Sequence, residues 1–217
     1  MKRDHWWAPL TGLAFVVVAI IAFVVGGEPP DSKHPAGEIA NFYKDNQSSI
    51  QLSAALITLA ALLLIFFAGY LRRELRQAEG EGGVLSLVAF SGAIVLAVGA
   101  AIDATLGFAM ADAADHIQPA QLQTLQALWD NDFLPLALGT DVLLLAAGLS
   151  IVRHRALAPW LGWVAVVLGV IGLTPVGFIA PLGGAVWVAI VSVMLALRAR
   201  GSAAPQPSAP PVVSPAT

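Results

Sequence analysis

Two aspartates stand alone in apolar surroundings, and their type and position could support proton or cation chemistry. Asp103 lies within an apolar stretch at 84–110 and Asp141 within another at 133–152. Because an isolated ionised carboxylate in hydrocarbon is very costly, each group must be protonated, hold a cation or contact water. If the two carboxyls approached each other, repulsion between them would let the pair share one proton. Asp103 and Asp141 therefore form a candidate intramembrane polar site.

A structural role is the alternative for the same two residues. As neutral acids they could hydrogen-bond to backbone carbonyls or to hydroxyl groups and join helices for about 1 kcal/mol each. The hydroxyl candidates are Thr58, Ser91, Thr105 and Thr140. Counted from the outer ends of their stretches, both aspartates are expected to lie roughly 10 to 12 Å deep. Adjacent antiparallel helices would then place them level with one another, facing into the bundle.

Six apolar stretches must position these side chains. They cover 8–26, 50–71, 84–110, 133–152, 159–177 and 181–197, each about long enough to cross the hydrocarbon core as a helix. Hydrophobic residues make up 58% of the chain and charged residues 12%, too little polar cover for a soluble domain. We therefore expect an all-α, polytopic transmembrane bundle over residues 1–200. A disordered cytoplasmic tail rich in Pro and Ala is expected at 201–217.

The basic residues predict the orientation of the bundle. Nine of them fall on one side of the expected membrane: Lys2, Arg3, Arg72, Arg73, Arg76, Arg153, Arg155, Arg198 and Arg200. Only Lys33 and Lys44 fall on the other side. The positive-inside rule then places both termini in the cytoplasm. The predicted location is the plasma membrane, with six passes.

Three further segments are expected outside the membrane or at its surface. Residues 36–49 contain no helix breaker and are expected to run as a helix into the second span. Residues 120–129 carry Leu122, Leu125, Leu128 and Trp129 at three-and-four spacing, which predicts a short amphipathic helix on the outer surface. Residues 174–183, with two prolines and two glycines, favour a turn between the last two spans. The alternative for that segment is a broken helix of the kind found in transporters.

Other kinds of site are weakly supported or excluded. The chain has no cysteine, which excludes disulfides, thiolate zinc sites and iron–sulfur clusters. Asp112 and His116 are four residues apart and, with Asp130 or Asp132, are weak candidates for a metal site on the outer face. A solvated acidic loop is the alternative. No phosphate-binding, nucleophile-elbow or zinc-protease motif occurs, and no cofactor and no nucleic-acid partner are expected.

The C-terminal half resembles a known group of sequences. The residues that carry the resemblance are 149–155, the run LAPWLGW at 157–163, the run VLG at 167–169, Trp187 and Ser192. They are similar to a large group of uncharacterised actinobacterial six-span membrane proteins. The resemblance extends more loosely over residues 1–200. It implies a plasma-membrane location and this fold, and it implies no substrate, cofactor or catalytic residue.

Three hypotheses of function follow from these features. The first is a non-enzymatic scaffold or accessory membrane protein that binds lipid, partner helices or a second copy of the chain; glycine-rich helix faces favour it. The second is a small proton- or cation-coupled transporter that uses Asp103 and Asp141. The third is a metal-dependent intramembrane hydrolase with metal at Asp112 and His116.

Overall fold

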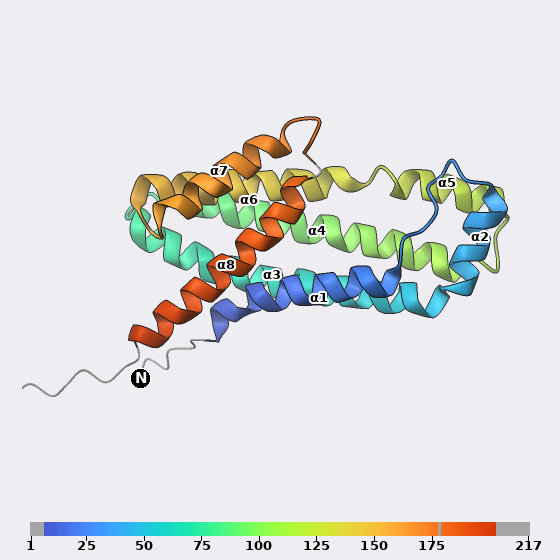
Figure 1. Ribbon diagram of the computed structural model, residues 1–217, viewed down its shortest axis with the longest axis horizontal. Coiled ribbons are helices and arrows are strands. Elements are labelled where there is room, and N and C mark those ends of the chain that lie inside the picture. Colours follow the sequence, from blue (N-terminus) through green and yellow to red (C-terminus); the bar gives the residue numbers. More distant parts are fainter. Residues whose placement is uncertain (1–6, 178, 203–217) are drawn as a thin grey trace, which may run out of the picture.

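The computed structural model describes residues 7–177 and 179–202, and every regular element in these ranges is a helix (Figure 1). A short 3-10 helix, Ala8–Leu10, leads into the first long helix. The others are α1 Thr11–Gly26, α2 Ala36–Asp45, α3 Gln47–Glu79, α4 Val84–Ala113, α5 Pro119–Trp129, α6 Phe133–His154, α7 Pro159–Gly172 and α8 Ile179–Ser202. The all-α fold is confirmed at this level. Residues 203–217, which cover most of the expected tail, lie outside the described residues.

Five segments are long and apolar enough to cross a membrane, which fits a membrane protein. They are Ala8–Gly26, Gln47–Glu79, Val84–Ala113, Pro119–His154 and Ile179–Gly201. The remaining apolar helix, α7, has only 14 residues and would be about 21 Å long. That is shorter than the roughly 30 Å of a hydrocarbon core.

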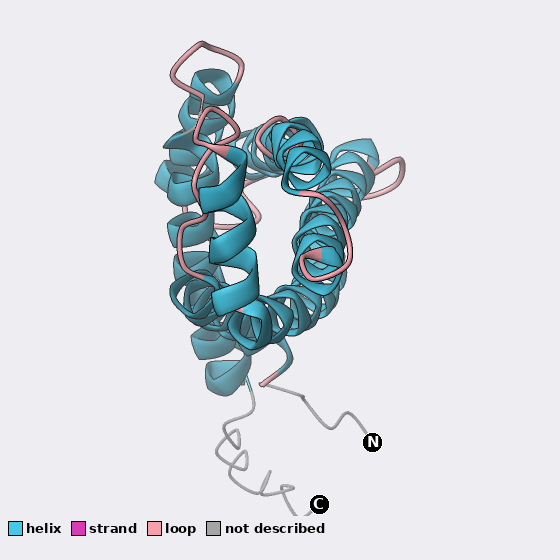
Figure 2. Ribbon diagram, turned by 90° about the vertical axis from the view of Figure 1, so that its right-hand side faces the viewer, coloured by secondary structure: helices cyan, strands magenta, loops and turns pink. Residues whose placement is uncertain are grey.

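Six helices pack in a closed ring, each against the next. The order is α1, α3, α4, α6, α7, α8 and back to α1, and Figure 2 shows the ring from one end. Ser192 of α8 closes it: its hydroxyl donates a hydrogen bond to the Pro9 carbonyl oxygen (2.6 Å) and accepts one from the Leu13 backbone N–H (2.9 Å). The Leu13 N–H lies in the first turn of α1, where no carbonyl of the same helix is available to it.

Glycines set the distance between neighbouring helices. A Cβ on Gly99 of α4 would lie 2.9 Å from the Leu136 nitrogen of α6, and one on Gly92 would collide with the Leu143 backbone. A Cβ on Gly139 of α6 would likewise collide with the Leu96 backbone of α4. Such close backbone approach is typical of helices that associate within lipid, where apolar side chains give no solvent-driven attraction.

Two helix boundaries differ from the sequence expectations. The helix expected over 36–49 is interrupted at Asn46, whose side-chain amide donates to the Phe42 carbonyl oxygen (2.9 Å) and so competes with the helical hydrogen bonds. The fifth stretch ends as a helix at Gly172 rather than at residue 177. Beyond it the chain turns, because Pro175 cannot continue the helix. The turn expected between the last two spans is confirmed for residues 173–177.

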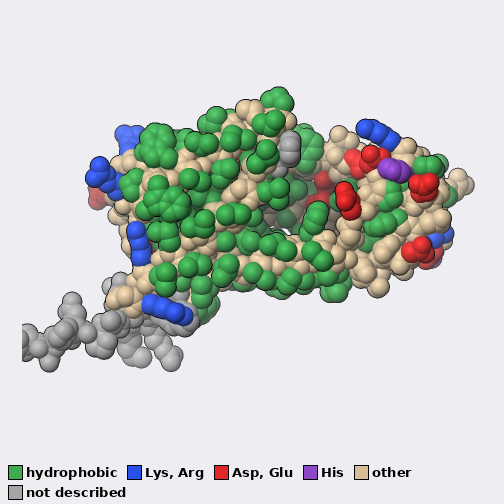
Figure 3. Space-filling model, in the orientation of Figure 1, with side chains coloured by type: hydrophobic (Ala, Val, Ile, Leu, Met, Phe, Trp, Pro, Cys, Tyr) green, Lys and Arg blue, Asp and Glu red, His purple; other side chains and the backbone are tan. Residues whose placement is uncertain are grey.

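The charged residues gather at opposite ends of an apolar belt. Figure 3 shows hydrophobic side chains over most of the length of the bundle, with most of the visible Lys and Arg side chains at one end and most of the visible Asp, Glu and His side chains at the other. The acidic end is formed by α2, α5 and the adjoining turns of α3 and α4. There α2 packs against α5, and Tyr43 donates a buried hydrogen bond to the Gln126 side-chain oxygen (2.7 Å). A cavity lined by Asp103, Trp129 and Asp130 lies at this end.

Candidate functional site

The two predicted aspartates are not level with each other. The glycine contacts fix the register of α4 and α6: Gly92 faces residues 142 and 143, and Gly99 faces residues 135 and 136. Asp141 therefore lies level with residue 94 of α4. Nine residues separate that level from Asp103, or about 13 Å along the helix axis. The expectation that antiparallel packing aligns the two carboxyls is wrong. The start of α6 does not lie level with the end of α4, so equal distances from these two ends do not give equal depths.

Asp103 lies close to the acidic end of the bundle. In α3, which runs antiparallel to α4, Ile50 is the nearest neighbour of Gly107. One turn further along α3, Ser53 donates to the Ala22 carbonyl oxygen (2.8 Å) near the end of α1. Asp103 is therefore about level with Gly26, the last residue of α1. Its carboxyl faces a cavity at this level.

Asp141 lies deeper and has a different environment. Its side chain is only 5% exposed and fills the space left by Gly172 of α7, since a Cβ on that glycine would collide with the carboxyl. Within the described residues its Oδ1 atom is buried without a hydrogen-bond partner. Asp141 does not line the cavity that contains Asp103, so the structure does not bring the two together.

The cavity near Asp103 has a volume of about 680 Å³ and lies between α1, α3 and α4, beneath α2 and the end of α5. Four aromatic rings and four carboxyl groups line it: Phe23, Phe42, Tyr43, Trp129, Glu28, Asp31, Asp103 and Asp130. None of the described residues that line it is Lys, Arg or His. Figure 3 shows a hollow on this side of the molecule, where acidic side chains meet the apolar belt.

The short α7–α8 hairpin leaves one side of the cavity open. Phe23 of α1 and Pro181 at the start of α8 both line the cavity, and the Phe23 side chain is 76% exposed on the apolar surface. The cavity therefore reaches the apolar belt as well as the acidic end. A molecule with an apolar body and a polar head could enter from either direction.

Asp103 has two close neighbours at the break between α5 and α6. Its carboxyl interacts with the Trp129 side chain and with the charge of Asp132. The Oδ2 atom of Asp132 is buried without a hydrogen-bond partner among the described residues. Asp130 is better satisfied, because it accepts hydrogen bonds from the Ser32 backbone N–H and from the Gln126 side chain, both at 2.8 Å. Among the described residues, no Lys, Arg or His forms an ion pair with Asp103 or Asp132.

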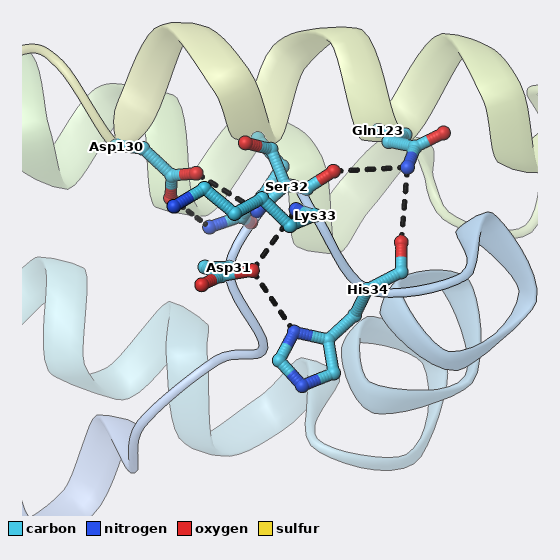
Figure 4. Close-up of polar contacts among 7 residues, drawn as sticks. Asp31, Ser32, Lys33, His34, Gln123 and Asp130 are labelled. Atoms are coloured by element: carbon cyan, nitrogen blue, oxygen red, sulfur yellow. Dashed lines mark hydrogen bonds and ion pairs between the residues drawn. The ribbon is translucent and has the colours of Figure 1, made fainter.

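The loop between α1 and α2 covers the acidic side of the cavity and is tied to α5 (Figure 4). The Gln123 side-chain amide donates to the Ser32 and His34 carbonyl oxygens, both at 2.9 Å. Asp31 accepts from the Lys33 backbone N–H (2.9 Å) and lies 3.0 Å from His34 Nδ1. The hydrogen bond that the His34 ring donates to the Asp31 carboxylate raises the pKa of His34 and lowers the pKa of Asp31.

Tyr43 also belongs to this wall of the cavity. Burial raises the pKa of its phenol, and the negative charges of Asp130 and Asp103 raise it further. The phenol therefore stays protonated and remains a donor to Gln126.

The sequence reasoning missed most of the cavity residues. Trp129, Tyr43, Glu28 and Asp31 line the cavity, and none of them is among the candidate site residues that the sequence indicates. A signal was present at Trp129 to Asp132, where an aromatic residue and two acids interrupt a helical pattern. The sequence could not tell that this break lies opposite Asp103.

The weak metal candidates lie elsewhere. Asp112 is exposed at the end of α4 and His116 is exposed in the following turn. Their neighbour Asp115 lies 3.7 Å from the Lys44 ammonium nitrogen. Among the described residues no three His, Asp or Glu side chains converge as a metal site would require. The arrangement therefore gives no support to metal at Asp112 and His116.

Comparison with known protein families, with curated proteins and with solved structures found no match to this chain.

Proposed function

We propose that the chain crosses the plasma membrane six times, with both termini in the cytoplasm. The arginines at one end of the belt support this orientation through the positive-inside rule. Although α7 is short, it packs between α6 and α8 in the ring, and this position supports counting it as a sixth span. The cavity near Asp103 then opens to the outer face and to the outer leaflet.

We further propose that the protein is a non-enzymatic membrane protein that binds an amphipathic organic cation in this cavity. The observation that carries the proposal is the lining: aromatic rings and carboxyl groups together, with no basic side chain among the described lining residues. Aromatic faces attract ammonium-type cations, most strongly where water is excluded. Apolar walls accommodate the rest of such a molecule. Asp103 supplies a carboxyl group beside the Trp129 side chain of the aromatic wall.

Proton- or cation-coupled transport by an aspartate pair has less support. The pair mechanism needs the two carboxyls within reach of each other, and about 13 Å of helix separates their levels. Asp141 also lies outside the cavity lining. A role for Asp141 in joining α6 to α7 fits its contact with Gly172 better.

Two ions of the same shape and opposite charge test the proposed cation site. Tetraphenylphosphonium and tetraphenylborate are titrated separately into the protein in neutral phosphatidylcholine nanodiscs, and empty nanodiscs provide the baseline for partition into lipid. We expect saturable binding of the phosphonium only. Asp103→Asn should weaken it about tenfold, which corresponds to about 1.4 kcal/mol.

Asp112→Asn is the matched control, because it removes one charge from the same helix outside the cavity lining. It should leave the affinity for the phosphonium unchanged. Equal binding of the two ions above the lipid baseline, or an affinity that Asp103→Asn does not alter, would contradict the proposal.

A further inference from the structure

The opposite end of the molecule carries a second concave surface, on the last turns of α3. This groove has a volume of about 570 Å³ and is lined by Gly69, Arg72, Arg73, Arg76, Gln77, Gly80 and Glu81. Three of these side chains are cationic and one is anionic. A Cβ on Gly69 would have nothing within 4 Å, so this glycine leaves open space beside the arginines. We call this surface the arginine groove.

The arginines of the groove are held in place without being neutralised. The Arg72 guanidinium lies 5.6 Å from the centre of the Phe90 ring, and the Arg73 guanidinium lies 5.6 Å from that of Tyr70. Contacts of this kind hold a guanidinium group against an aromatic ring without neutralising its charge. In the part of the chain that the structure describes, no carboxylate lies within 4.0 Å of Arg72, Arg73 or Arg76. The Arg72 Nε atom is buried and has no hydrogen-bond partner there.

An exposed apolar stripe runs along α3 to the arginine groove. Leu59, Leu62 and Phe66 are 44%, 50% and 63% exposed, and their three-and-four spacing continues to Gly69 and Arg73 on the same face of the helix. Gly69 is ten residues beyond Leu59, a rise of about 15 Å along the helix. This length matches half of a hydrocarbon core of about 30 Å. The stripe and the groove together have the length and polarity of one phospholipid molecule in a single leaflet.

We propose that the arginine groove binds the phosphate-bearing headgroup of an anionic phospholipid, with an acyl chain along the stripe from Leu59 to Phe66. Arginine is suited to this task because its planar group donates two parallel hydrogen bonds to phosphate oxygens. Basic recesses beside transmembrane helices bind anionic headgroups in this way. The glycerol region of the lipid would lie at Gly69, where a larger side chain would exclude it. The proposal requires only that α3 lies in a bilayer, and it holds for either orientation of the chain.

Lipid retention tests the proposal. The full chain is purified in nanodiscs that contain phosphatidylcholine and phosphatidylglycerol, and native mass spectrometry measures which lipid remains bound. We expect phosphatidylglycerol to be retained selectively. The double variant Arg73→Gln, Arg76→Gln should bind it about thirtyfold more weakly, since each interfacial arginine contributes a factor of about five.

The control variant removes the same number of positive charges at the same end of the molecule, but from other residues. Arg153→Gln with Arg155→Gln lies at the end of α6, outside the arginine groove, and should keep the selectivity of the unaltered protein. Gly69→Leu changes no charge and meets no neighbouring atom at its Cβ, so it should fold normally and still lower retention. Equal losses in the two double variants would overturn the proposal in favour of a general surface charge.

The source of the phosphate is tested separately. Glycerol 3-phosphate is titrated into the protein in pure phosphatidylcholine nanodiscs. We expect no saturable binding, because the soluble compound lacks the acyl chain that the stripe would hold. Saturable binding that Arg73→Gln with Arg76→Gln abolishes would overturn the assignment to a lipid.

Discussion

Asp31 and His34 contact each other within the loop that covers the cavity near Asp103. Their side chains are 3.0 Å apart, and the Asp31 carboxylate also accepts the Lys33 backbone N–H, which favours a tight turn. Both side chains are largely exposed, so solvent screens their attraction and its contribution to stability is small. The pair is therefore best studied through its titration rather than through the unfolding of the protein.

The contact between Asp31 and His34 should exist only in a window of pH. The pKa of His34 is raised above 6.5 by its hydrogen bond to Asp31, so the stabilisation is lost as the pH rises through that raised pKa. The pKa of Asp31 is lowered below 3.8 by the same bond, so the contact is also lost as the pH falls through that lowered pKa. NMR titration of the His34 ring should give a pKa above 6.5 that falls in Asp31→Asn.

Asp115→Asn is the control for this titration, because it removes an acidic side chain at the same end whose partner is Lys44. It should leave the His34 titration unchanged. A His34 pKa that is the same with and without the Asp31 carboxylate would contradict the hydrogen bond.

At the level of single residues, the sequence identified unusual side chains but not their surroundings. Asp103 and Asp141 stand out because no basic residue shares their stretches. The ends of apolar runs predict how deep each aspartate lies in its own helix, but they do not predict the register of that helix against its neighbour. The register depends on backbone contacts at Gly92 and Gly139, which form only when the two helices pack.

At the level of helices, glycine contacts decide how α4 and α6 fit together. The face of α4 that carries Gly92 and Gly99 lies against α6. Glycine-rich helix faces in the sequence predict close packing of helices, but they do not predict which helix each face contacts. The six apolar stretches correspond to α1, α3, α4, α6, α7 and α8, whereas several ends differ. The end of α7 depends on a local turn at Pro175, and the break at Asn46 depends on a side-chain bond to Phe42.

Gly92→Ala should destabilise the protein by about 1 to 3 kcal/mol, because an added methyl group would force the α4 and α6 backbones apart. Gly107→Ala is the matched control on the same helix, since its Cβ would meet only Ile50, at 3.9 Å. The control should be neutral or slightly stabilising, because alanine favours helix more than glycine does. Unfolding in dodecyl sulfate, followed by tryptophan fluorescence, measures the difference. Equal stability of the two variants would show that the α4–α6 contact is less tight than described.

At the scale of the whole molecule, the unequal helix lengths create the cavity near Asp103. The ring is closed from α1 to α8, but the hairpin of α7 and α8 turns at residues 173–177, before the ring reaches α2 and α5 (Figure 1). The wall of the cavity is therefore open beside Phe23 and Pro181. At the other end α3 extends to Glu79, which places the arginine groove beyond the apolar belt.

The orientation of the whole chain can be tested with single cysteines, because the natural sequence contains none. Lys33→Cys lies in the exposed loop at the acidic end, and Gln77→Cys is exposed on α3 at the basic end. If the positive-inside rule holds, a membrane-impermeant maleimide should label Lys33→Cys in intact cells and Gln77→Cys only after permeabilisation. The unaltered protein should remain unlabelled. The reverse pattern would turn the cation cavity toward the cytoplasm and the arginine groove toward the outer leaflet, which would contradict the proposed topology but leave both binding tests valid in nanodiscs.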